Sequence, residues 1–299
     1  MDPIASPNRI IRPGVLILLA LLLPACRATG DGASDRVVSQ TALFDGQLVH
    51  YLDAGGDSDE ALVLIHGWAS STVAWRHQFP ALADRARVLN VDLIGHGKSE
   101  LPRGDLDMAL MADSVVAAMD DAGVARAVFV GHSNGVPVAQ NVWRRHPERT
   151  LAIVGIDGTL QPLFEREDVA GFFELFRGSG WRDVVAGMIV GMQAPDMTEV
   201  DRAALLEMAL ATPQETIVDS LDATLDDDAW TDEPLTVPLL LVLAAQPQWD
   251  EAYEAKVRER ASRLDYRVWQ GVGHFVQFER PDEFRTALLE FLDAHDLLR

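Results

Sequence analysis

Short apolar runs alternate with amphipathic stretches along most of this chain. Continuous apolar runs are typical of strands that are buried on both faces of a parallel sheet. The stretches between them carry apolar residues at helical spacing and predict helices. The strand runs are residues 61–65, 88–91, 127–130, 151–156, 238–244 and 265–269, and the helical stretches are residues 72–85, 107–121, 136–146 and 250–262. This alternation, with short connections, predicts an α/β fold with a mostly parallel sheet wound with helices on both faces.

Two parts of the chain depart from this alternation. Residues 37–44 and 47–52, joined near Asp45 and Gly46, predict an antiparallel hairpin that leads into the sheet. Between about residues 160 and 230, helical patterns follow one another with no strand between them, at residues 169–176, 181–192, 199–210 and 213–225. We interpret this segment as a helical cap inserted over the carboxyl edge of the sheet. The expected organisation is a core of residues 40–159 and 231–299, interrupted by a cap at residues 160–230.

The N-terminus has a pattern of its own. Arg9 and Arg12 precede an apolar run at residues 15–23 that is too short to span a bilayer comfortably. Basic residues followed by such a run are typical of a secretory signal peptide, which we assign to residues 1–25. The segment ends in Leu23-Pro24-Ala25-Cys26, which resembles the lipobox of bacterial lipoproteins, where the cysteine is lipidated and becomes the mature N-terminus.

The lipobox resemblance implies a membrane-anchored lipoprotein that is lipidated at Cys26. Residues 26–39, rich in Ala, Gly, Ser and Asp, would then form a flexible tether. Plain secretion and an uncleaved anchor are the alternatives. Arg27 does not match the aspartate signal that retains lipoproteins at the inner membrane, so the expected location is the outer membrane, facing the periplasm. Cys26 is the only cysteine, which excludes an intramolecular disulfide.

Composition narrows the range of partners. Of the 299 residues, 48% are hydrophobic, enough to bury a large core as one domain with an insertion. The net charge of −21 argues against nucleic acid and anionic lipid surfaces as partners, and its simplest interpretation is solubility. No two histidines stand at metal-ligand spacing with a carboxylate or a thiol, so we expect neither a metal nor another cofactor.

The most informative motif is Gly131-His132-Ser133-Asn134-Gly135, which follows the apolar run 127–130 and precedes a helical pattern. A strand that turns sharply into a helix holds its turn residue in a strained conformation, and the flanking glycines remove Cβ clashes. The turn lifts the Ser133 hydroxyl to a helix N-terminus, where developing negative charge is favoured. Alone, the motif is also compatible with a plain glycine-rich turn between a strand and a helix.

Two further motifs follow predicted strands at positions that an acyl-transfer site needs. His66-Gly67-Trp68 follows residues 61–65, and its glycine lets the loop approach the nucleophile. The backbone N–H groups of Trp68 and Asn134 are therefore candidates for an oxyanion hole. Gly271-Val272-Gly273-His274-Phe275 follows residues 265–269 and makes His274 the best candidate for a general base.

The remaining histidines of these motifs have simpler explanations. Residues 92–99, with the sequence DLIGHGKS, form a tight glycine turn that we interpret as structural, shaping the rim of the pocket. His66, His96 and His132 each lie within a turn motif, where a structural role is favoured.

Together these motifs resemble those of the α/β-hydrolase superfamily. The matching pieces, in order along the chain, are HGW (66–68), DLIGHGKS (92–99), GHSNG (131–135) and GVGHF (271–275). The resemblance extends from about residue 37 to the C-terminus and implies an α/β-hydrolase fold with a helical cap. It also implies Ser133 as nucleophile, His274 as base, and the amides of Trp68 and Asn134 as oxyanion hole.

The acid of the implied triad is where the chain departs from the family pattern. The family usually places it in the loop after the strand at 238–244, but the residue that aligns there is Gln248. Glutamine can hydrogen-bond an imidazole, yet it cannot stabilise an imidazolium electrostatically. Asp157, at the end of the strand 151–156, is the favoured candidate, and Asp250, which could equally cap the following helix, is the alternative. A site without a working acid is the third possibility.

These residues predict a serine hydrolase that acts on a small apolar ester or lactone through an acyl-enzyme on Ser133. The same catalytic residues are also compatible with a carbon–carbon bond hydrolase or a perhydrolase. The fold alone also permits a non-catalytic small-molecule binding protein. Large apolar side chains in the cap are expected either to form the core of the cap or to roof the pocket. They are Phe164, Phe172, Phe173, Phe176, Trp181, Met188 and Met192.

Overall fold

The computed structural model describes residues 37–298. The expected signal peptide, the lipidation site Cys26 and nearly all of the expected tether lie outside the described residues. Within residues 37–298, no helix has both the length and the apolar character needed to cross a membrane.

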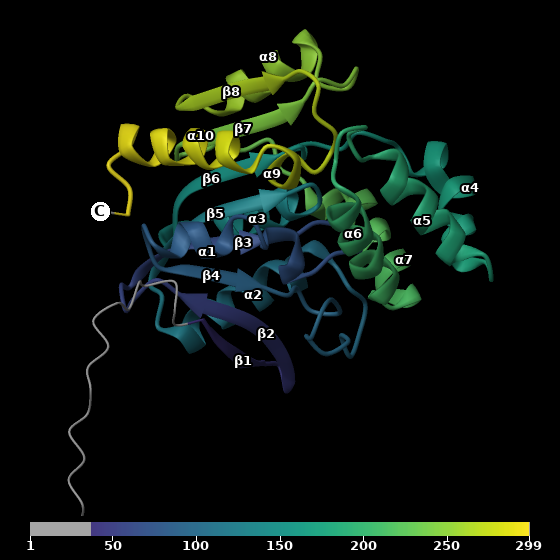
Figure 1. Cartoon of the computed structure of the whole chain (residues 1–299), viewed down its shortest axis with the longest axis horizontal. Helices are drawn as coiled ribbons and strands as arrows, with labels where there is room; N and C mark the ends of the chain where they lie inside the picture. The colour runs from purple at the N-terminus through teal and green to yellow at the C-terminus, as the bar shows by residue number, and fades with distance from the viewer. Residues whose placement is uncertain (1–36, 299) are drawn as a thin grey trace, which may run out of the picture. The chain divides into compact units, whose positions relative to one another are not determined.

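A single eight-stranded sheet organises the described chain (Figure 1). The strands are β1 (Val38–Phe44), β2 (Gln47–Ala54), β3 (Glu60–Ile65), β4 (Val88–Val91), β5 (Arg126–His132), β6 (Thr150–Ile156), β7 (Leu239–Ala244) and β8 (Leu264–Trp269). They lie in the order β1-β2-β4-β3-β5-β6-β7-β8. The hairpin β1–β2 is antiparallel and joins antiparallel to β4, whereas the strands from β4 to β8 are parallel to their neighbours. The predicted fold class, a mostly parallel sheet in an α/β fold, is confirmed.

Alternate side chains of each central strand enter two separate hydrophobic cores, because successive side chains in a strand point to opposite faces. In β3, Val63 packs in the core beneath α2 (Met108–Ala122), α3 (Gly135–Arg145) and α8 (Glu251–Arg260). Its neighbour Leu64 packs in the opposite core with α1 (Phe79–Ala83), α9 (Val276–Glu279) and α10 (Pro281–Ala294). The central strands are therefore covered on both faces, which explains their continuous apolar sequences.

Four helices separate β6 from β7. They are α4 (Arg166–Arg177), α5 (Trp181–Gly191), α6 (Glu199–Ala211) and α7 (Gln214–Asp222). Figure 1 shows them gathered beside the ends toward which the parallel strands point. Their buried side chains, among them Phe176, Val185 and Leu205, join the core that also holds Leu64. The cap is thus packed onto the sheet domain at the edge where the loops of the four motifs emerge.

The helix predicted over residues 72–85 is wrong as a continuous element. The segment forms a short 3-10 helix, η2 (Thr72–Trp75), and then α1 (Phe79–Ala83), which has Pro80 in its first turn. Proline lacks an N–H donor and clashes with the preceding turn in a helix interior, but it fits the start of a new helix. Gln78 fills the break, where its buried amide donates hydrogen bonds to the carbonyls of Gln277 and Pro281.

Candidate active site

The turn between β5 and α3 has the geometry expected of a nucleophile elbow. Ser133 itself has a φ of 52°, a conformation that costs a non-glycine residue free energy. The two flanking glycines allow close packing: a Cβ on Gly131 would lie 2.3 Å from the Gly135 carbonyl oxygen, and one on Gly135 would lie 2.3 Å from that of Ile65. The backbone strain is therefore placed on Ser133 alone, at the start of α3.

His274 is paired with Asp157. The Nδ1 atom of His274 lies 2.6 Å from Oδ2 of Asp157, which directly follows β6 and is 4% exposed. The other carboxylate oxygen of Asp157 accepts hydrogen bonds from the Ala244 amide at 2.9 Å and from the Trp249 indole at 3.0 Å. Because both carboxylate oxygens are occupied, Asp157 is fixed in an orientation that holds the imidazole by Nδ1 and leaves its Nε2 atom for another partner.

The two other residues considered at the acid position lie elsewhere. Asp250 is the N-cap of α8, where its carboxylate accepts a hydrogen bond from the Tyr253 amide at 2.8 Å. It does not line the cavity that holds Ser133 and His274, whereas the exposed Gln248 does. The structure thus brings together Ser133, His274 and Asp157, and it leaves Asp250 with a capping contact.

The loop that carries Trp68 passes directly against the elbow. A Cβ on Gly67 would lie 2.9 Å from the Cβ of Ser133, so the loop reaches this position only with glycine there. Within residues 37–298, neither the Trp68 nor the Asn134 backbone N–H donates a hydrogen bond. The indole N–H of Trp68 donates to the Ile217 carbonyl of α7 at 2.8 Å, which ties this loop to the cap. The two amides are therefore free to bind an oxyanion beside Ser133.

His132 contacts the loop that carries His274, residues 270–275, which we call the histidine loop. Its Nε2 atom donates to the backbone carbonyl of His274 at 2.9 Å, and the two rings are 4.8 Å apart at their centroids. Its Nδ1 atom is buried and, within the described part of the chain, has no hydrogen-bond partner. Burial, and after it the charge of His274, hold the pKa of His132 well below its usual value. The neutral His132 ring thus supports the loop that carries His274, a role that its place in a turn motif did not reveal.

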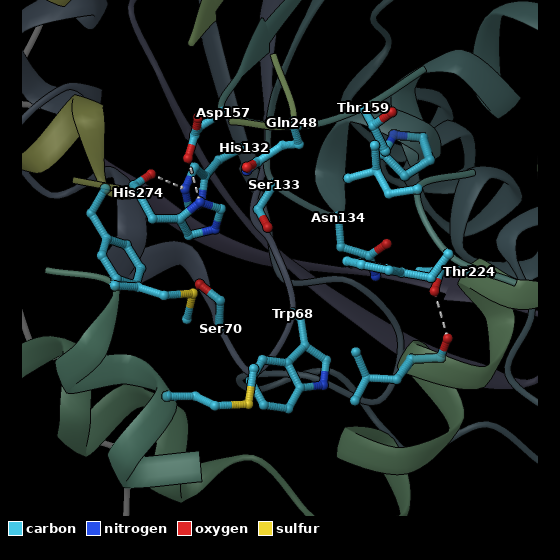
Figure 2. Close-up of a pocket in the computed structure, with 18 of the residues that line it drawn as sticks. Trp68, Ser70, His132, Ser133, Asn134, Asp157, Thr159, Thr224, Gln248 and His274 are labelled. Carbon is cyan, nitrogen blue, oxygen red and sulfur yellow. Dashed lines mark hydrogen bonds and ion pairs between the residues drawn. The ribbon is translucent and has the colours of Figure 1, made fainter. Parts of the chain in front are cut away.

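One cavity of about 270 Å³ holds these groups (Figure 2). Ser133, Asn134, Asp157 and His274 line it together with Trp68 and polar side chains such as Gln248. Its remaining walls are mostly apolar, and none of the residues between 37 and 298 that line it is Lys or Arg. The apolar lining residues are Trp68, Pro137, Leu163, Phe164, Met188, Ile189, Met192, Leu221, Leu225, Trp230, Trp249 and Phe275.

The apolar cap residues singled out from the sequence divide into two groups. Phe164, Met188 and Met192 line the cavity. Phe173, Phe176 and Trp181 are buried away from it, and Phe172 is partly exposed against Phe176. The cap therefore uses one part of this set for its own packing and another part to enclose the cavity.

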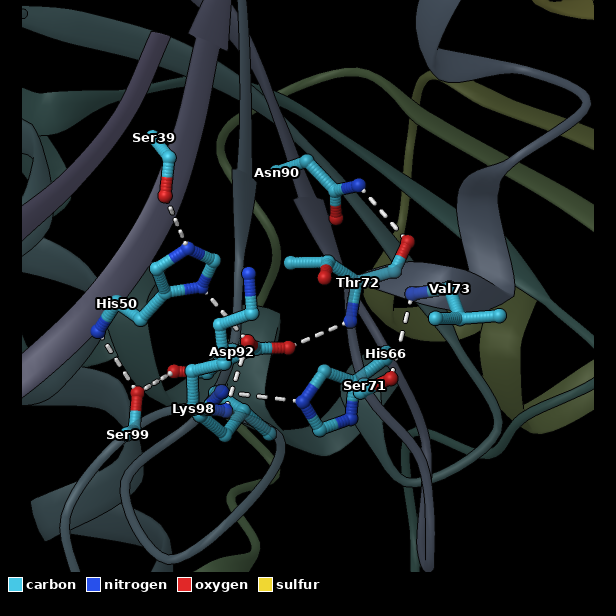
Figure 3. Close-up of polar contacts among 11 residues, drawn as sticks. Ser39, His50, His66, Ser71, Thr72, Val73, Asn90, Asp92, Lys98 and Ser99 are labelled. Atoms are coloured by element: carbon cyan, nitrogen blue, oxygen red, sulfur yellow. Dashed lines mark hydrogen bonds and ion pairs between the residues drawn. The ribbon is translucent and has the colours of Figure 1, made fainter. Parts of the chain in front are cut away.

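Residues 92–99 form a structural turn, and none of them lines the cavity. The carboxylate of Asp92 accepts hydrogen bonds from the Thr72 and Lys98 amides at 2.6 and 3.0 Å and lies 2.7 Å from Nδ1 of His50 (Figure 3). Burial alone would raise the pKa of Asp92, but the contact with His50, the charge of His66 and the two amide hydrogen bonds together outweigh burial and lower the pKa. A Cβ on Gly97, which has a φ of +55°, would lie 2.3 Å from this carboxylate. The structural role predicted for this turn is supported, but its expected contribution to the pocket rim is wrong, because its side chains hold neighbouring loops together and none of them lines the cavity.

Three buried histidines should make the protein sensitive to mild acid. Burial is the main cause that lowers the pKa of His66 and His132, and it lowers the pKa of His96 to about 3. The unfolded chain binds a proton at each of them near pH 6.5, while the folded chain does not, so stability falls as the pH drops below about 6.5. Three such groups give a limiting slope of about 4 kcal/mol per pH unit.

This slope can be measured by urea denaturation at several pH values between 7 and 5, above the range in which carboxylates titrate. His96→Gln should lower the slope by about a third, because one of the three linked protons is removed. His295→Gln, a change at the C-terminal end of α10, serves as control and should leave the slope as it is. A free energy of unfolding that stays constant between pH 7 and 5 would contradict neutral burial of these rings.

Two contributors to the site were missed from the sequence. Trp249 is 8% exposed and donates to Asp157, yet in the sequence it is only the residue next to Gln248 in the loop after β7. Glu279 contacts the amides of Gly273 and Ala194, although its sequence position five residues after His274 carries no chemical signal of its own.

As regards metals, residues 37–298 contain no cluster of three His, Cys, Asp or Glu side chains able to hold an ion.

Comparisons with known proteins agree with this architecture. The family model described as the alpha/beta hydrolase fold matches residues 60–186. The chain is 28% identical over 285 residues to the dihydrolipoyllysine-residue acetyltransferase component of the acetoin cleaving system of Pseudomonas putida, a match that covers 89% of this chain and 73% of that protein. It is 26% identical over 318 residues to epoxide hydrolase A of Mycobacterium tuberculosis, covering 85% of this chain and 96% of that protein.

Among solved structures, the enol-lactonase of Burkholderia xenovorans LB400 is similar, with a TM-score of 0.73 at 21% identity. The match covers 85% of this chain and 100% of that one. The described chain therefore has the α/β-hydrolase fold, as its four motifs predicted.

Proposed function

We propose that this protein hydrolyses neutral carboxylic esters or lactones through an acyl-enzyme on Ser133. The observation that carries the proposal is the pairing of His274 with the buried Asp157 at 2.6 Å, in the same cavity as the strained Ser133. A carboxylate that holds Nδ1 of the imidazole leaves Nε2 free to accept the proton of a serine hydroxyl. The enol-lactonase of Burkholderia xenovorans LB400, which has the same fold, is consistent with this class of substrate.

In this mechanism the groups of the site act in sequence. His274 takes the proton of Ser133 as the serine oxygen attacks the substrate carbonyl, and Asp157 stabilises the imidazolium that forms. The Trp68 and Asn134 amides bind the oxyanion of the tetrahedral intermediate. His274 then donates its proton to the leaving alcohol, and in the second half of the cycle it activates the water that cleaves the acyl-enzyme.

A serine nucleophile does not suit epoxide hydrolysis, although one relative is named for it. An aspartate that opens an epoxide forms an ester, which water can cleave. A serine that opens an epoxide would form an ether, which water does not cleave under the same conditions. The residue at the elbow therefore favours acyl transfer, and with it esters and lactones, over ring opening of epoxides.

The cavity also sets limits on the substrate. Its volume of about 270 Å³ is at the small end of ligand pockets, which are typically about 300–1,000 Å³. In the part of the chain that the structure describes, no lysine or arginine lines it to pair with a substrate carboxylate, and the whole chain carries a net charge of −21. An anionic substrate would lose its hydration without gaining a partner, so neutral substrates with short acyl groups fit best.

We expect p-nitrophenyl butyrate to be hydrolysed with a kcat/KM at least about tenfold higher than the p-nitrophenyl monoester of glutaric acid, because a carboxylate buried without a partner costs well over 1.4 kcal/mol. The two esters share a leaving group and have similar chain lengths, so the comparison isolates the charge. A series from acetate to dodecanoate would locate the upper limit of the acyl pocket. Equal rates on the neutral and anionic esters would contradict the proposed substrate class, and no hydrolysis of any ester would favour a non-catalytic binding role.

A further inference from the structure

The backbone of His274 is held from two sides. Its N–H donates to the carbonyl of Met192, at the C-terminal end of the cap helix α5, at 2.8 Å. Its carbonyl accepts the hydrogen bond from His132 at 2.9 Å. The histidine loop therefore lies between the elbow of the sheet domain and the linker that joins α5 to α6, residues 192–198. We refer to residues 192–198 as the cap linker.

Glu279 joins the same two segments with its carboxylate. One oxygen of this carboxylate accepts a hydrogen bond from the Ala194 amide in the cap linker at 3.0 Å, and the other accepts from the Gly273 amide in the histidine loop. The fit is tight, because a Cβ on Gly273 would lie 2.6 Å from the Met192 oxygen and 2.7 Å from both the Ala194 nitrogen and the Glu279 carboxylate. One side chain thus links the residue next to His274 to the cap.

Helix stability does not explain an acidic residue at this position. α9 has only four residues, so Glu279 belongs to its first turn as well as to its last, and the end charges of so short a helix give no preference for an acidic side chain there. Within residues 37–298, no salt bridge involves its carboxylate. Its hydrogen bonds in the described chain are those to the two backbone amides, and hydrogen bonds to an ionised acceptor are stronger than those between neutral groups.

The cap linker is in turn fixed to the rest of the cap. Arg202 of α6 donates hydrogen bonds to the carbonyls of Ala194 and Pro195 at 2.7 and 2.8 Å and to that of Met197 at 3.1 Å. A shift of α6 would therefore move the cap linker, and through Glu279 it would move Gly273 and His274. This chain of contacts connects the cap to the imidazole without passing through the substrate cavity.

We propose that Glu279 is a positioning residue for His274 and makes the placement of this imidazole depend on the position of the cap. This inference rests on the proposed function, because it assigns His274 the role of general base. Without the two hydrogen bonds of Glu279, the bond from the His274 N–H to the Met192 carbonyl still joins the histidine loop to the cap linker, but Gly273 is no longer fixed. The loop then has more freedom, and Nδ1 of His274 can shift relative to the fixed carboxylate of Asp157. Displacements of about 1 Å in a catalytic group can reduce turnover about a hundredfold.

The test compares three variants of the full chain. Glu279→Gln keeps the size of the side chain but presents an amide group to one of the two backbone N–H donors. Glu279→Asp keeps the charge but shortens the reach. Glu283→Gln changes an exposed carboxylate on the neighbouring helix α10 and is the matched control. We expect both Glu279 variants to lower kcat on p-nitrophenyl butyrate about ten- to a hundredfold with KM changed less than about threefold, and the control to match the wild type.

A second measurement does not depend on activity. The proton on Nδ1 of His274, bound to a carboxylate at 2.6 Å, should give a low-field proton NMR signal that is assigned by its loss in His274→Gln. We expect this signal to weaken or move upfield in both Glu279 variants and to stay unchanged in Glu283→Gln. If the signal changes as expected in a protein that cleaves no ester, the positioning role stands and the proposed function fails.

Two results would overturn the proposal. One is a wild-type kcat and NMR signal in Glu279→Gln. The other is a wild-type kcat and signal in Glu279→Asp alone, since this would show that the negative charge near His274 matters and that the hydrogen bonds to the two amides do not. Circular dichroism at the assay temperature establishes that each variant is folded when it is compared.

Discussion

Ser133→Ala should abolish ester hydrolysis and labelling by fluorophosphonates while leaving the fold intact. Ser133 is the residue held at a φ of 52° between β5 and α3, and Gly67 brings the oxyanion loop against its Cβ. Removal of a serine nucleophile in a well-studied protease lowers turnover about a millionfold, so a loss of at least about ten-thousandfold is expected here. The assays are turnover of p-nitrophenyl butyrate and gel detection of the labelled protein.

Ser70→Ala is the matched control for this variant. Ser70 lines the same cavity, but its hydroxyl donates to the sulfur of Met208 at 3.4 Å, and it does not lie at the turn between β5 and α3. It should keep turnover within a few fold and keep the label. Label that persists on Ser133→Ala would show that another residue is the nucleophile.

Ser133→Gly should raise the free energy of unfolding by about 1 kcal/mol, because glycine adopts a positive φ without strain.

The order and type of most elements of the sheet domain could be predicted from local sequence. Central strands such as β3 and β5 are buried on both faces, so their apolar runs are continuous and stand out between polar helices. The break at Gln78 could not be read from periodicity, because the buried side chain of Gln78 is held by carbonyls near residue 280, about two hundred positions away in sequence. Pro80 was the local signal that should have divided the helix predicted there.

The pairing of the acid with His274 was beyond local sequence for a different reason. The sequence favours Asp157 because it directly ends a strand, and Asp250 stays the alternative because it follows a strand by a few residues and could equally cap the next helix. What separates them is tertiary. β7 lies between β6 and β8 in the sheet, yet His274, from the loop after β8, lies 2.6 Å from Asp157, which follows β6, whereas Asp250 caps α8. Trp249 and Glu279 are harder still, because each acts on a residue that only the folded chain brings near.

Asp157→Asn should reduce turnover by at least about a hundredfold. Oδ1 of Asp157 accepts hydrogen bonds from the Ala244 amide and the Trp249 indole, so an asparagine would keep its oxygen there and turn its NH₂ group toward His274. Nδ1 of His274 would then have to accept a hydrogen bond, which places the proton on Nε2 and prevents that atom from taking the Ser133 proton. The same substitution in the protease template costs about ten-thousandfold in turnover through this wrong tautomer.

Asp250→Asn is the matched comparison and should change turnover a few fold at most. Its carboxylate caps α8 by accepting from the Tyr253 amide at 2.8 Å, and asparagine caps helices about as well as aspartate. Replacement by alanine should cost about 1 kcal/mol of stability and leave turnover nearly unchanged. Asp157→Asn and Asp250→Asn should therefore differ in kcat on p-nitrophenyl butyrate and not in melting temperature. A larger loss of kcat in Asp250→Asn than in Asp157→Asn would show that Asp250 is the acid that pairs with His274. Near-wild-type turnover in both variants and in the double variant would mean that His274 works without a carboxylate partner.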